Sequence, residues 1–156
     1  MVTYQILSEK TAANKLSAVY QLFVDNFSSF GWSYSEFLHN VQSGAQVFCY
    51  VENQGVPVGA LQGSYVLDEG ELLHIAVCPT MRQRGLGGGL LALFFTTLKA
   101  HGVAKVFLEV RQGNQGAQRL YEKNGFIKIS QRKNYYQNPT ENAWIYVKEL
   151  KEAENE

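Results

Sequence analysis

The sequence predicts an α/β fold with a mixed sheet. The chain has 156 residues, which is the length of one ordinary domain. Residues 46–77 contain Val-, Phe- and Tyr-rich segments separated by short polar turns, which is typical of an antiparallel meander. Residues 86–150 then alternate helical and strand patterns. With two helices before the meander, the expected element order is β-α-α-β-β-β-α-β-α-β-β.

The N-terminal third is expected to hold one strand and two helices. Residues 2–7 alternate in polarity, as a strand does. Ser8 or Thr11 is a candidate N-cap for the first helix, and Ser33 with Glu36 has the spacing of a capping box for the second. The first helix, to about residue 26, has apolar residues at helical spacing (Leu16, Val19, Tyr20, Phe23 and Phe27), and the second ends near Ser43-Gly44.

The remaining elements are expected to be mostly strands. Strands are predicted over residues 46–52, 56–67 and 71–77, with turns at residues 53–55 and 68–70. After Pro79, a helix with Gly102 as its C′ residue, a strand over residues 104–110 and a helix from Asn114 to Asn124-Gly125 follow. Strands over residues 126–131 and 143–150 flank a long connection. Residues 1–150 therefore form one predicted domain, and residues 151–156 a frayed tail.

The charge balance excludes one class of protein and leaves one question open. Fourteen Lys and Arg residues balance fourteen Asp and Glu residues, which argues against a nucleic-acid partner held by bulk electrostatics. The charge is uneven along the chain, however: −5 over residues 1–81, +8 over residues 82–133 and −3 over residues 134–156. The cationic middle indicates either a polyanionic ligand or solvated helix faces.

Cysteine and histidine usage argues against a disulfide framework and against a metal site. Cys49 and Cys78 are the two cysteines, and the three histidines lack metal-ligand spacing. The N-terminus lacks the pattern of a signal peptide, and no segment has transmembrane length, so we expect a cytoplasmic protein without a membrane partner. Cys78 is not expected to act as a covalent nucleophile, because the sequence indicates no partnered base for it.

The most informative segment is the glycine-rich stretch at residues 82–89, RQRGLGGG. Glycines let backbone N–H groups approach a ligand closely, and the start of the following helix favours an anion. Arg82 and Arg84 add mobile positive charge. The pattern fits neither a P-loop nor a dinucleotide fingerprint. We interpret it as a pyrophosphate site; the alternative is a flexible turn whose glycines allow close helix packing.

The motif Arg82-x-x-Gly85-x-Gly87 resembles the signature of the GNAT superfamily of N-acetyltransferases. Its flanks, including Ile75-Ala76-Val77, Leu108-Glu109-Val110-Arg111 and Arg132-x-Asn134-Tyr135-Tyr136, resemble the RimI-type subfamily, which acetylates the N-terminal alanine of a ribosomal protein. The resemblance implies a GNAT fold, with a mostly antiparallel, twisted sheet flanked by helices. It also implies acetyl-CoA as co-substrate, bound by Ile75, Ala76, Val77, Arg82, Gln83, Arg84, Gly85, Leu86, Gly87, Gly88 and Asn114. Asn114 could instead serve only as a helix N-cap.

Two residues are candidates for the chemistry. Glu109 is a single acid in an otherwise apolar strand, so it is either functional or a solvent-facing edge residue. The resemblance implies that Glu109 accepts the proton of the attacking amine. It likewise implies that Tyr121 acts as general acid toward the coenzyme sulfur, with an orienting role or simple core packing as alternatives. Trp32, Tyr34, Tyr135 and Tyr136 are candidates for the acceptor groove or for packing alone.

The resemblance predicts direct transfer of an acetyl group to an amine, most specifically a protein N-terminal alanine. Acetylation of lysine side chains or of small amines is an alternative, and a non-catalytic acyl-CoA sensor is a third. The chain departs from the subfamily pattern at Gly31, Gly88, Gly113, Gln137 and Asn142. Three of these departures flank the acceptor side, which leaves the acceptor less well defined than the donor. The oligomeric state is not predicted.

Overall fold

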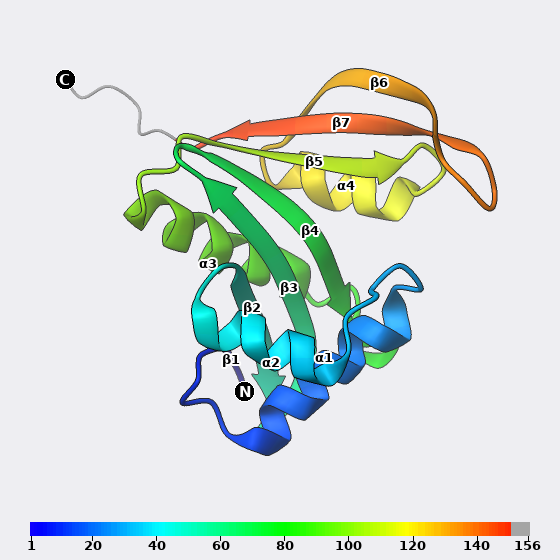
Figure 1. Cartoon of the computed structure of the whole chain (residues 1–156). Coiled ribbons are helices and arrows are strands. Elements are labelled where there is room, and N and C mark those ends of the chain that lie inside the picture. Colours follow the sequence, from blue (N-terminus) through cyan, green and yellow to red (C-terminus); the bar gives the residue numbers. More distant parts are fainter. Residues whose placement is uncertain (151–156) are drawn as a thin grey trace. The chain divides into compact units, whose positions relative to one another are not determined.

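The computed structural model describes residues 1–150 and has the predicted order of elements (Figure 1). The predicted tail at residues 151–156 lies outside the described residues. The strands are β1 (Val2–Ile6), β2 (Val47–Asn53), β3 (Val56–Val66), β4 (Glu69–Val77), β5 (Lys105–Arg111), β6 (Ile127–Tyr136) and β7 (Glu141–Glu149). The helices are α1 (Ala13–Asn26), α2 (Tyr34–Ser43), the short 3-10 helix η1 (Pro79–Met81), α3 (Leu86–Ala100) and α4 (Gln115–Lys123).

The strands form a seven-stranded sheet in the order β1-β2-β3-β4-β5-β7-β6. β4 pairs with β5 in parallel, whereas the pairs β1–β2, β2–β3, β5–β7 and β6–β7 are antiparallel. This confirms a mixed, mostly antiparallel sheet. The chain divides into two compact units: the first unit contains residues 1–64 and 72–97, and the second unit contains residues 65–71 and the chain from Leu98 onward. The expectation of a single domain stays a prediction.

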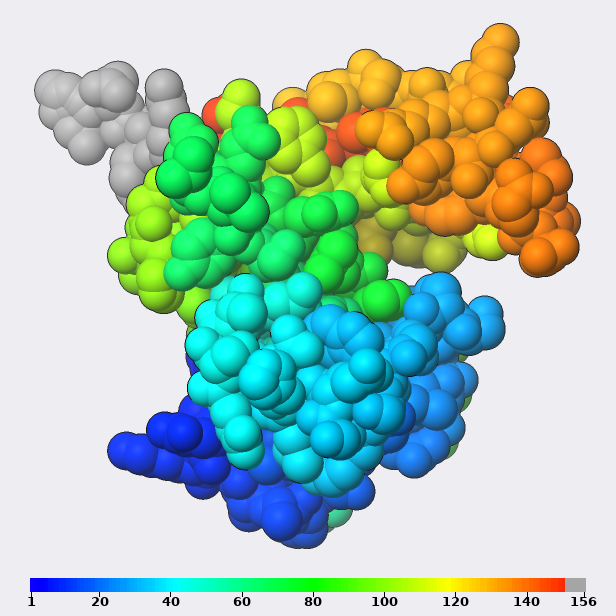
Figure 2. All heavy atoms as spheres, in the orientation of Figure 1, coloured from blue at the N-terminus to red at the C-terminus, as the bar shows by residue number. Residues whose placement is uncertain are grey.

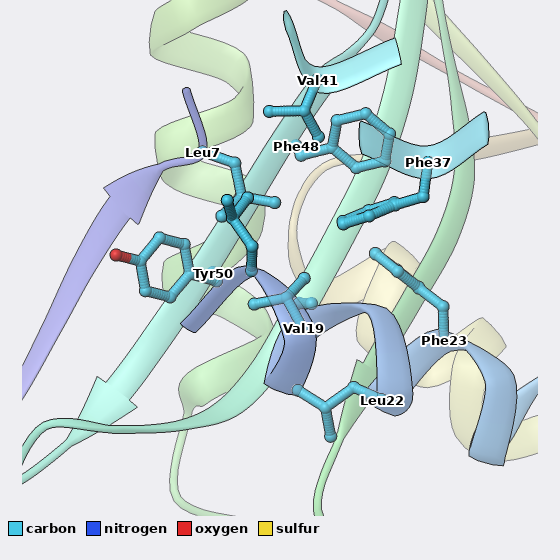
Figure 3. Packing of buried hydrophobic residues seen from close by; sticks show 10 residues of the cluster. Leu7, Val19, Leu22, Phe23, Phe37, Val41, Phe48 and Tyr50 are labelled. Atoms are coloured by element: carbon cyan, nitrogen blue, oxygen red, sulfur yellow. The ribbon is translucent and has the colours of Figure 1, made fainter. Parts of the chain in front are cut away.

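The first unit contains a core of large aromatic and aliphatic side chains (Figure 3). Phe23 of α1 and Phe37 of α2 are completely buried, and their rings pack against Phe48 of β2. Burial of each such ring contributes about 1.5–3 kcal/mol. The other labelled residues of this cluster are Leu7, Val19, Leu22, Val41 and Tyr50.

The two predicted helix starts of the first unit differ in outcome. The capping box of α2 is confirmed, because Ser33 Oγ accepts the Glu36 N–H and Glu36 Oε1 accepts the Ser33 N–H. The predicted cap of α1 by Ser8 or Thr11 is wrong: the N-cap is Ala12, which makes no side-chain capping bond. Thr11 Oγ1 instead accepts the Ser8 N–H at 3.0 Å, so these two residues close the turn before the helix.

The turn between β3 and β4 lies one residue earlier than predicted, at Leu67 and Asp68. Leu67 has a left-handed backbone with φ 57°. The physical reason is pairing with β5, since Glu69 and Gly70 already lie in register with Lys105 and Val106. Residues predicted to turn are therefore the first residues of a strand.

In the second unit, helix α4 covers one face of β5 and β7 (Figure 1). Leu108 of β5 pairs with Tyr146 of β7, whose ring contacts Tyr121 of α4 at a centroid distance of 6.3 Å. Side chains alternate along a strand, so Glu109 points to the opposite face of β5. That face, which α4 does not cover, is called the open face below.

The C-terminal hairpin is longer than predicted. β6 was expected to end at residue 131 and to be followed by a long connection, but it continues to Tyr136. The pair Arg132↔Ala143 follows the first of two register shifts, and the pair Tyr136↔Glu141 follows the second. Every residue of β6 except Tyr136 is exposed, and the strand lies at the surface in orange in Figure 2. The hairpin therefore presents Arg132 and Tyr135 from a strand.

No helix within residues 1–150 is both long enough and apolar enough to cross a membrane.

Candidate active site

The glycine-rich stretch is the exposed turn that leads from η1 into α3. Residues 82–85 are exposed, and Gln83 and Gly85 have left-handed backbones with φ 64° and 79°. The first helical bond runs from the Gly89 N–H to the Gly85 carbonyl at 3.1 Å. The N–H groups of residues 86–88 therefore precede the first helical bond, and the helix offers them no carbonyl. This arrangement suits the binding of an anion.

Arg82 and Gly89 have structural roles in this segment. Arg82 Nε donates to the Val77 carbonyl at 3.0 Å, so the guanidinium is anchored to the end of β4. The predicted mobility of this charge is therefore wrong for Arg82. A Cβ on Gly89 would collide with the ring of Tyr4, so part of the glycine pattern serves helix packing. The packing interpretation therefore applies to Gly89, and the pyrophosphate interpretation of the other residues stays a prediction.

Trp32 and Tyr34 belong to the aromatic cluster of the first unit. Both are partly buried against its core. The Tyr20 hydroxyl donates to the Trp32 carbonyl at 2.8 Å, and the Tyr20 and Tyr34 rings lie 5.2 Å apart between centroids. These contacts account for both residues as packing residues, and their predicted role in acceptor binding stays a prediction.

His74 is a polar residue of the first unit that sequence reasoning did not single out. Its Nδ1 lies 2.7 Å from Gln62 Oε1, and its ring packs 4.5 Å from the ring of Phe27. Burial lowers the pKa of His74, so the neutral imidazole is favoured. In the sequence, only the position of His74 in a predicted strand, next to Ile75, indicated that this histidine could be buried.

Glu109 lies on the open face of β5 in the second unit, with its side chain 26% exposed. Arg132 Nη1 of β6 is 3.6 Å from Glu109 Oε2. A hydrogen bond with the Glu109 carboxylate, followed by partial burial, raises the pKa of Tyr135. The Tyr135 ring lies 5.2 Å from the Arg132 guanidinium, so the predicted residues Glu109 and Tyr135 share Arg132 as a neighbour. Glu109 is accessible to a ligand and is held by two side chains of the hairpin.

Glu71 of β4 is a second carboxylate near Glu109. It pairs in parallel with Phe107, two residues before Glu109, and therefore shares the open face. Partial burial, followed by the negative charge of Glu109, raises the pKa of Glu71. The sequence placed this acid after a hairpin turn, and only the β4–β5 register brings it beside Glu109.

Tyr121 lies on α4 with only 8% of its surface exposed. Burial, followed by a smaller effect of Tyr136, raises the pKa of Tyr121 to about 12. A phenol is protonated at neutral pH even at its ordinary pKa of about 10, and burial strengthens this preference for the protonated form. Partial burial and the Glu109 charge likewise raise the pKa of Tyr136.

Asn114 is the N-cap of α4, as predicted, and its Oδ1 accepts the Ala117 N–H at 3.1 Å. Its amide NH₂ is a separate donor group, so capping leaves a donor for a ligand. The departure at Asn142 also has a local explanation. Asn142 Nδ2 donates to Gln112 Oε1 at 3.0 Å while its Oδ1 accepts the Asn134 N–H at 2.9 Å. An aspartate would lack the first of these donors.

Neither cysteine has the setting of a nucleophile. Burial raises the pKa of Cys49 to about 12, and Cys78 packs partly buried against the core of the first unit. Within residues 1–150 no group of three or more His, Cys, Asp or Glu side chains is arranged to hold a metal ion.

Comparison with known proteins identifies the family. The sequence model of the Acetyltransferase (GNAT) family matches residues 16–126, and the chain belongs to this family. It is accordingly an acetyl-CoA-dependent N-acetyltransferase, as the resemblance predicted.

The two relatives described here are both named for the acetylation of a ribosomal protein alanine. The [ribosomal protein bS18]-alanine N-acetyltransferase of Haemophilus ducreyi is 37% identical over 117 residues, which cover 73% of this chain and 80% of the relative. The enzyme of the same name from Escherichia coli is 38% identical over 108 residues, which cover 69% and 72% of the two chains.

Solved structures agree with the fold. The crystal structure of the ribosomal-protein-S18-alanine N-acetyltransferase from Escherichia coli has a TM-score of 0.80 and 31% identity, and the match covers 99% of this chain and 97% of that one. Ard1 from Thermoplasma volcanium has a TM-score of 0.79 and 26% identity, with coverage of 97% and 99%. The predicted GNAT fold is confirmed.

Proposed function

We propose that this N-acetyltransferase modifies the N-terminal α-amine of a protein, with alanine as the terminal residue. The structural observation that carries the proposal is the accessible Glu109 carboxylate on the open face, held by Arg132 and Tyr135. The relatives named above, which act on the N-terminal alanine of a ribosomal protein, support this choice of acceptor.

The acceptor must lose a proton before it reacts. An α-ammonium has a pKa of about 7.7–8.0, so much of it is protonated at neutral pH. Glu109 takes this proton, directly or through one water. The nearby carboxylate of Glu71 adds a second negative charge that favours a cationic amine on the open face.

The acetyl group then moves in one displacement. The amine nitrogen attacks the thioester carbonyl carbon, the new C–N bond forms, and the C–S bond breaks with its electron pair on sulfur. Tyr121, whose phenol is protonated at neutral pH, gives its proton to the leaving thiolate. No covalent intermediate on the protein is needed.

The donor is assigned to the end of β4 and the start of α3 in the first unit. The N–H groups of residues 86–88 and the charges of Arg82 and Arg84 suit a pyrophosphate. Gln83 and Gly85 shape the turn through their left-handed backbones. We assign the peptide groups of residues 75–77 to hydrogen bonds with the pantetheine arm.

The test compares kcat/KM for three acceptors: a peptide with an N-terminal alanine, the same peptide blocked at its N-terminus but carrying a lysine, and spermidine. The proposal predicts that the first is used best and that Glu109→Gln lowers its turnover while acetyl-CoA binding persists. Faster turnover of the blocked peptide or of spermidine would assign the alternative acceptor. If neither wild type nor Glu109→Gln acetylates any of the three amines while both bind acetyl-CoA equally well, the non-catalytic acyl-CoA sensor would be favoured.

A further inference from the structure

Arg111, the last residue of β5, contacts the far end of the β6–β7 hairpin at four points. Its Nη1 lies 3.1 Å from Glu141 Oε1 and 3.2 Å from the Pro139 carbonyl, and its Nη2 lies 3.3 Å from the Gln137 carbonyl. The guanidinium also stacks 4.3 Å from the centroid of the Tyr136 ring. One planar cation therefore connects β5 to both arms and the tip of the hairpin.

Glu141 extends this network to helix α4. Its Oε1 accepts from Arg111, and its Oε2 accepts the Gly113 N–H. Gly113 directly precedes Asn114, the N-cap of the helix that carries Tyr121. A Cβ on Gly113 would lie 2.7 Å from Glu141 Oε2, so the absence of a side chain there leaves room for the carboxylate.

The same network leads to Glu109. The Tyr136 ring under Arg111 makes an edge contact with Tyr135 at 5.1 Å between centroids. The Tyr135 ring lies 5.2 Å from the Arg132 guanidinium, and Arg132 Nη1 is 3.6 Å from Glu109 Oε2. The Arg111–Glu141 pair thus touches neither proposed catalytic group, yet it is linked to Glu109 through the two tyrosines and Arg132. It is linked to Tyr121 through the start of α4.

An isolated surface ion pair would not have consequences of this kind, because such pairs contribute little. Arg111 and Glu141 are 37% and 25% exposed, but each has more than one partner. A lysine could not replace Arg111, since a single ammonium lacks the flat fork that reaches a carboxylate, two carbonyls and a ring together. Groups coupled in this way change function when any one of them is removed.

We propose that Arg111 and Glu141 are positioning residues for the acceptor. Together they hold residues 137–140 and the tyrosine pair in the arrangement that binds the acceptor, so that little ordering remains when it arrives. This inference rests on the proposed function, because it assigns the acceptor side to the open face of the second unit.

The experiment measures KM for acetyl-CoA and KM for the N-terminal-alanine peptide in Arg111→Met, Arg111→Lys, Glu141→Gln and the double variant Arg111→Met/Glu141→Gln. We expect acceptor KM to rise about fivefold or more in Arg111→Met, with acetyl-CoA KM within about twofold of wild type. Arg111→Lys should not restore the acceptor KM. The double variant should be no worse than the more affected single variant, because the residues act together.

Arg119→Met is the matched control, since it removes one positive charge from an exposed position on α4 of the same unit. It should leave both KM values within about twofold of wild type. An equal rise in both KM values, a loss of thermal stability that accounts for the activity, or an unchanged acceptor KM in Arg111→Met would overturn the inference. If wild type prefers a lysine or polyamine acceptor, the proposed N-terminal acceptor fails, and the same KM comparison with that amine still tests the positioning pair.

Discussion

The first unit and the second unit distribute their polar and apolar residues in different ways. In the first unit, completely buried rings such as Phe23 and Phe37 meet between α1, α2 and β2. In the second unit, α4 covers one face of β5, and the open face carries charged and phenolic groups that contact one another, including Glu109 and Arg132. We therefore expect substitutions of the buried rings in the first unit to lower stability, and substitutions on the open face of the second unit to lower acetyl transfer to the acceptor.

The largest expected effect on activity comes from Glu109→Gln on the open face. The variant keeps the size of the side chain but cannot take the amine proton, so kcat should fall by about 10²–10⁴-fold. The rate of acetyl transfer to the alanine peptide at saturating acetyl-CoA measures this. The melting temperature should stay near that of wild type, because Glu109 is not part of the buried core. A residual rate close to wild type would remove Glu109 from the chemistry.

The largest expected effect on stability comes from Phe37→Ala in the first unit. Loss of a completely buried ring leaves a cavity and should lower the free energy of unfolding by about 3–5 kcal/mol. Urea unfolding monitored by circular dichroism measures this. Ile129→Ala, at an exposed position of β6, should change the same free energy by less than about 0.5 kcal/mol. Equal losses in the two variants would contradict the contrast between the units.

Tyr121→Phe should have a smaller effect on turnover than Glu109→Gln. The leaving thiolate is already stable, so loss of the phenol should lower kcat by about tenfold to a hundredfold. The acetyl-CoA KM measured in the same assay distinguishes the two roles left open for this residue. A raised KM with normal kcat would assign Tyr121 to orientation of the thioester instead of proton donation.

Gly113→Ala sharpens the inference about Arg111 and Glu141 without removing either residue. The added methyl group would meet Glu141 Oε2, and the carboxylate has to move away from the Gly113 N–H. We expect an acceptor KM about threefold higher, as for the loss of one hydrogen bond, and an unchanged acetyl-CoA KM. Gly116→Ala, at an open position on α4, should not raise the acceptor KM and serves as the control.

The smallest expected effect is a pH-dependent gain of stability in Glu71→Gln. The pKa of Glu71 is raised in the folded state, so ionisation of this group opposes folding. The variant should therefore melt slightly higher than wild type at pH 7. The gain should disappear as pH falls below the ordinary glutamate pKa of about 4.3, where the side chain is protonated in both states. Calorimetry between pH 3 and pH 8 measures it, and a difference that grows toward acid would have the wrong sign.

Sequence reasoning succeeded where the signal is local. The capping box at Ser33, the helix end at Ser43-Gly44 and the N-cap at Asn114 depend on neighbouring residues and were predicted. The turn at Leu67 and the extent of β6 depend on pairing with β5 and β7, and the predictions there were wrong.

The candidate site divides in the same way. The glycine-rich stretch and the single acid Glu109 could be recognised from motif and composition. The contacts of the second unit could not. Glu71 comes beside Glu109 only through the β4–β5 register, and Arg132 comes beside it through the registers of β5, β7 and β6. Glu141 contacts Gly113, which lies 28 residues earlier in the chain. Long-range pairing of this kind has no local sequence signature.

The measurement that tests the central claim most directly uses one peptide with two competing amines. A peptide with an N-terminal alanine and an internal lysine is incubated with the enzyme and acetyl-CoA, and fragmentation mass spectrometry locates the added acetyl group. We predict that the group is on the alanine nitrogen in wild type and that its rate of appearance falls in Glu109→Gln and in Arg111→Met but not in Arg119→Met. An acetyl group on the lysine side chain, with the terminal amine free, would contradict the account.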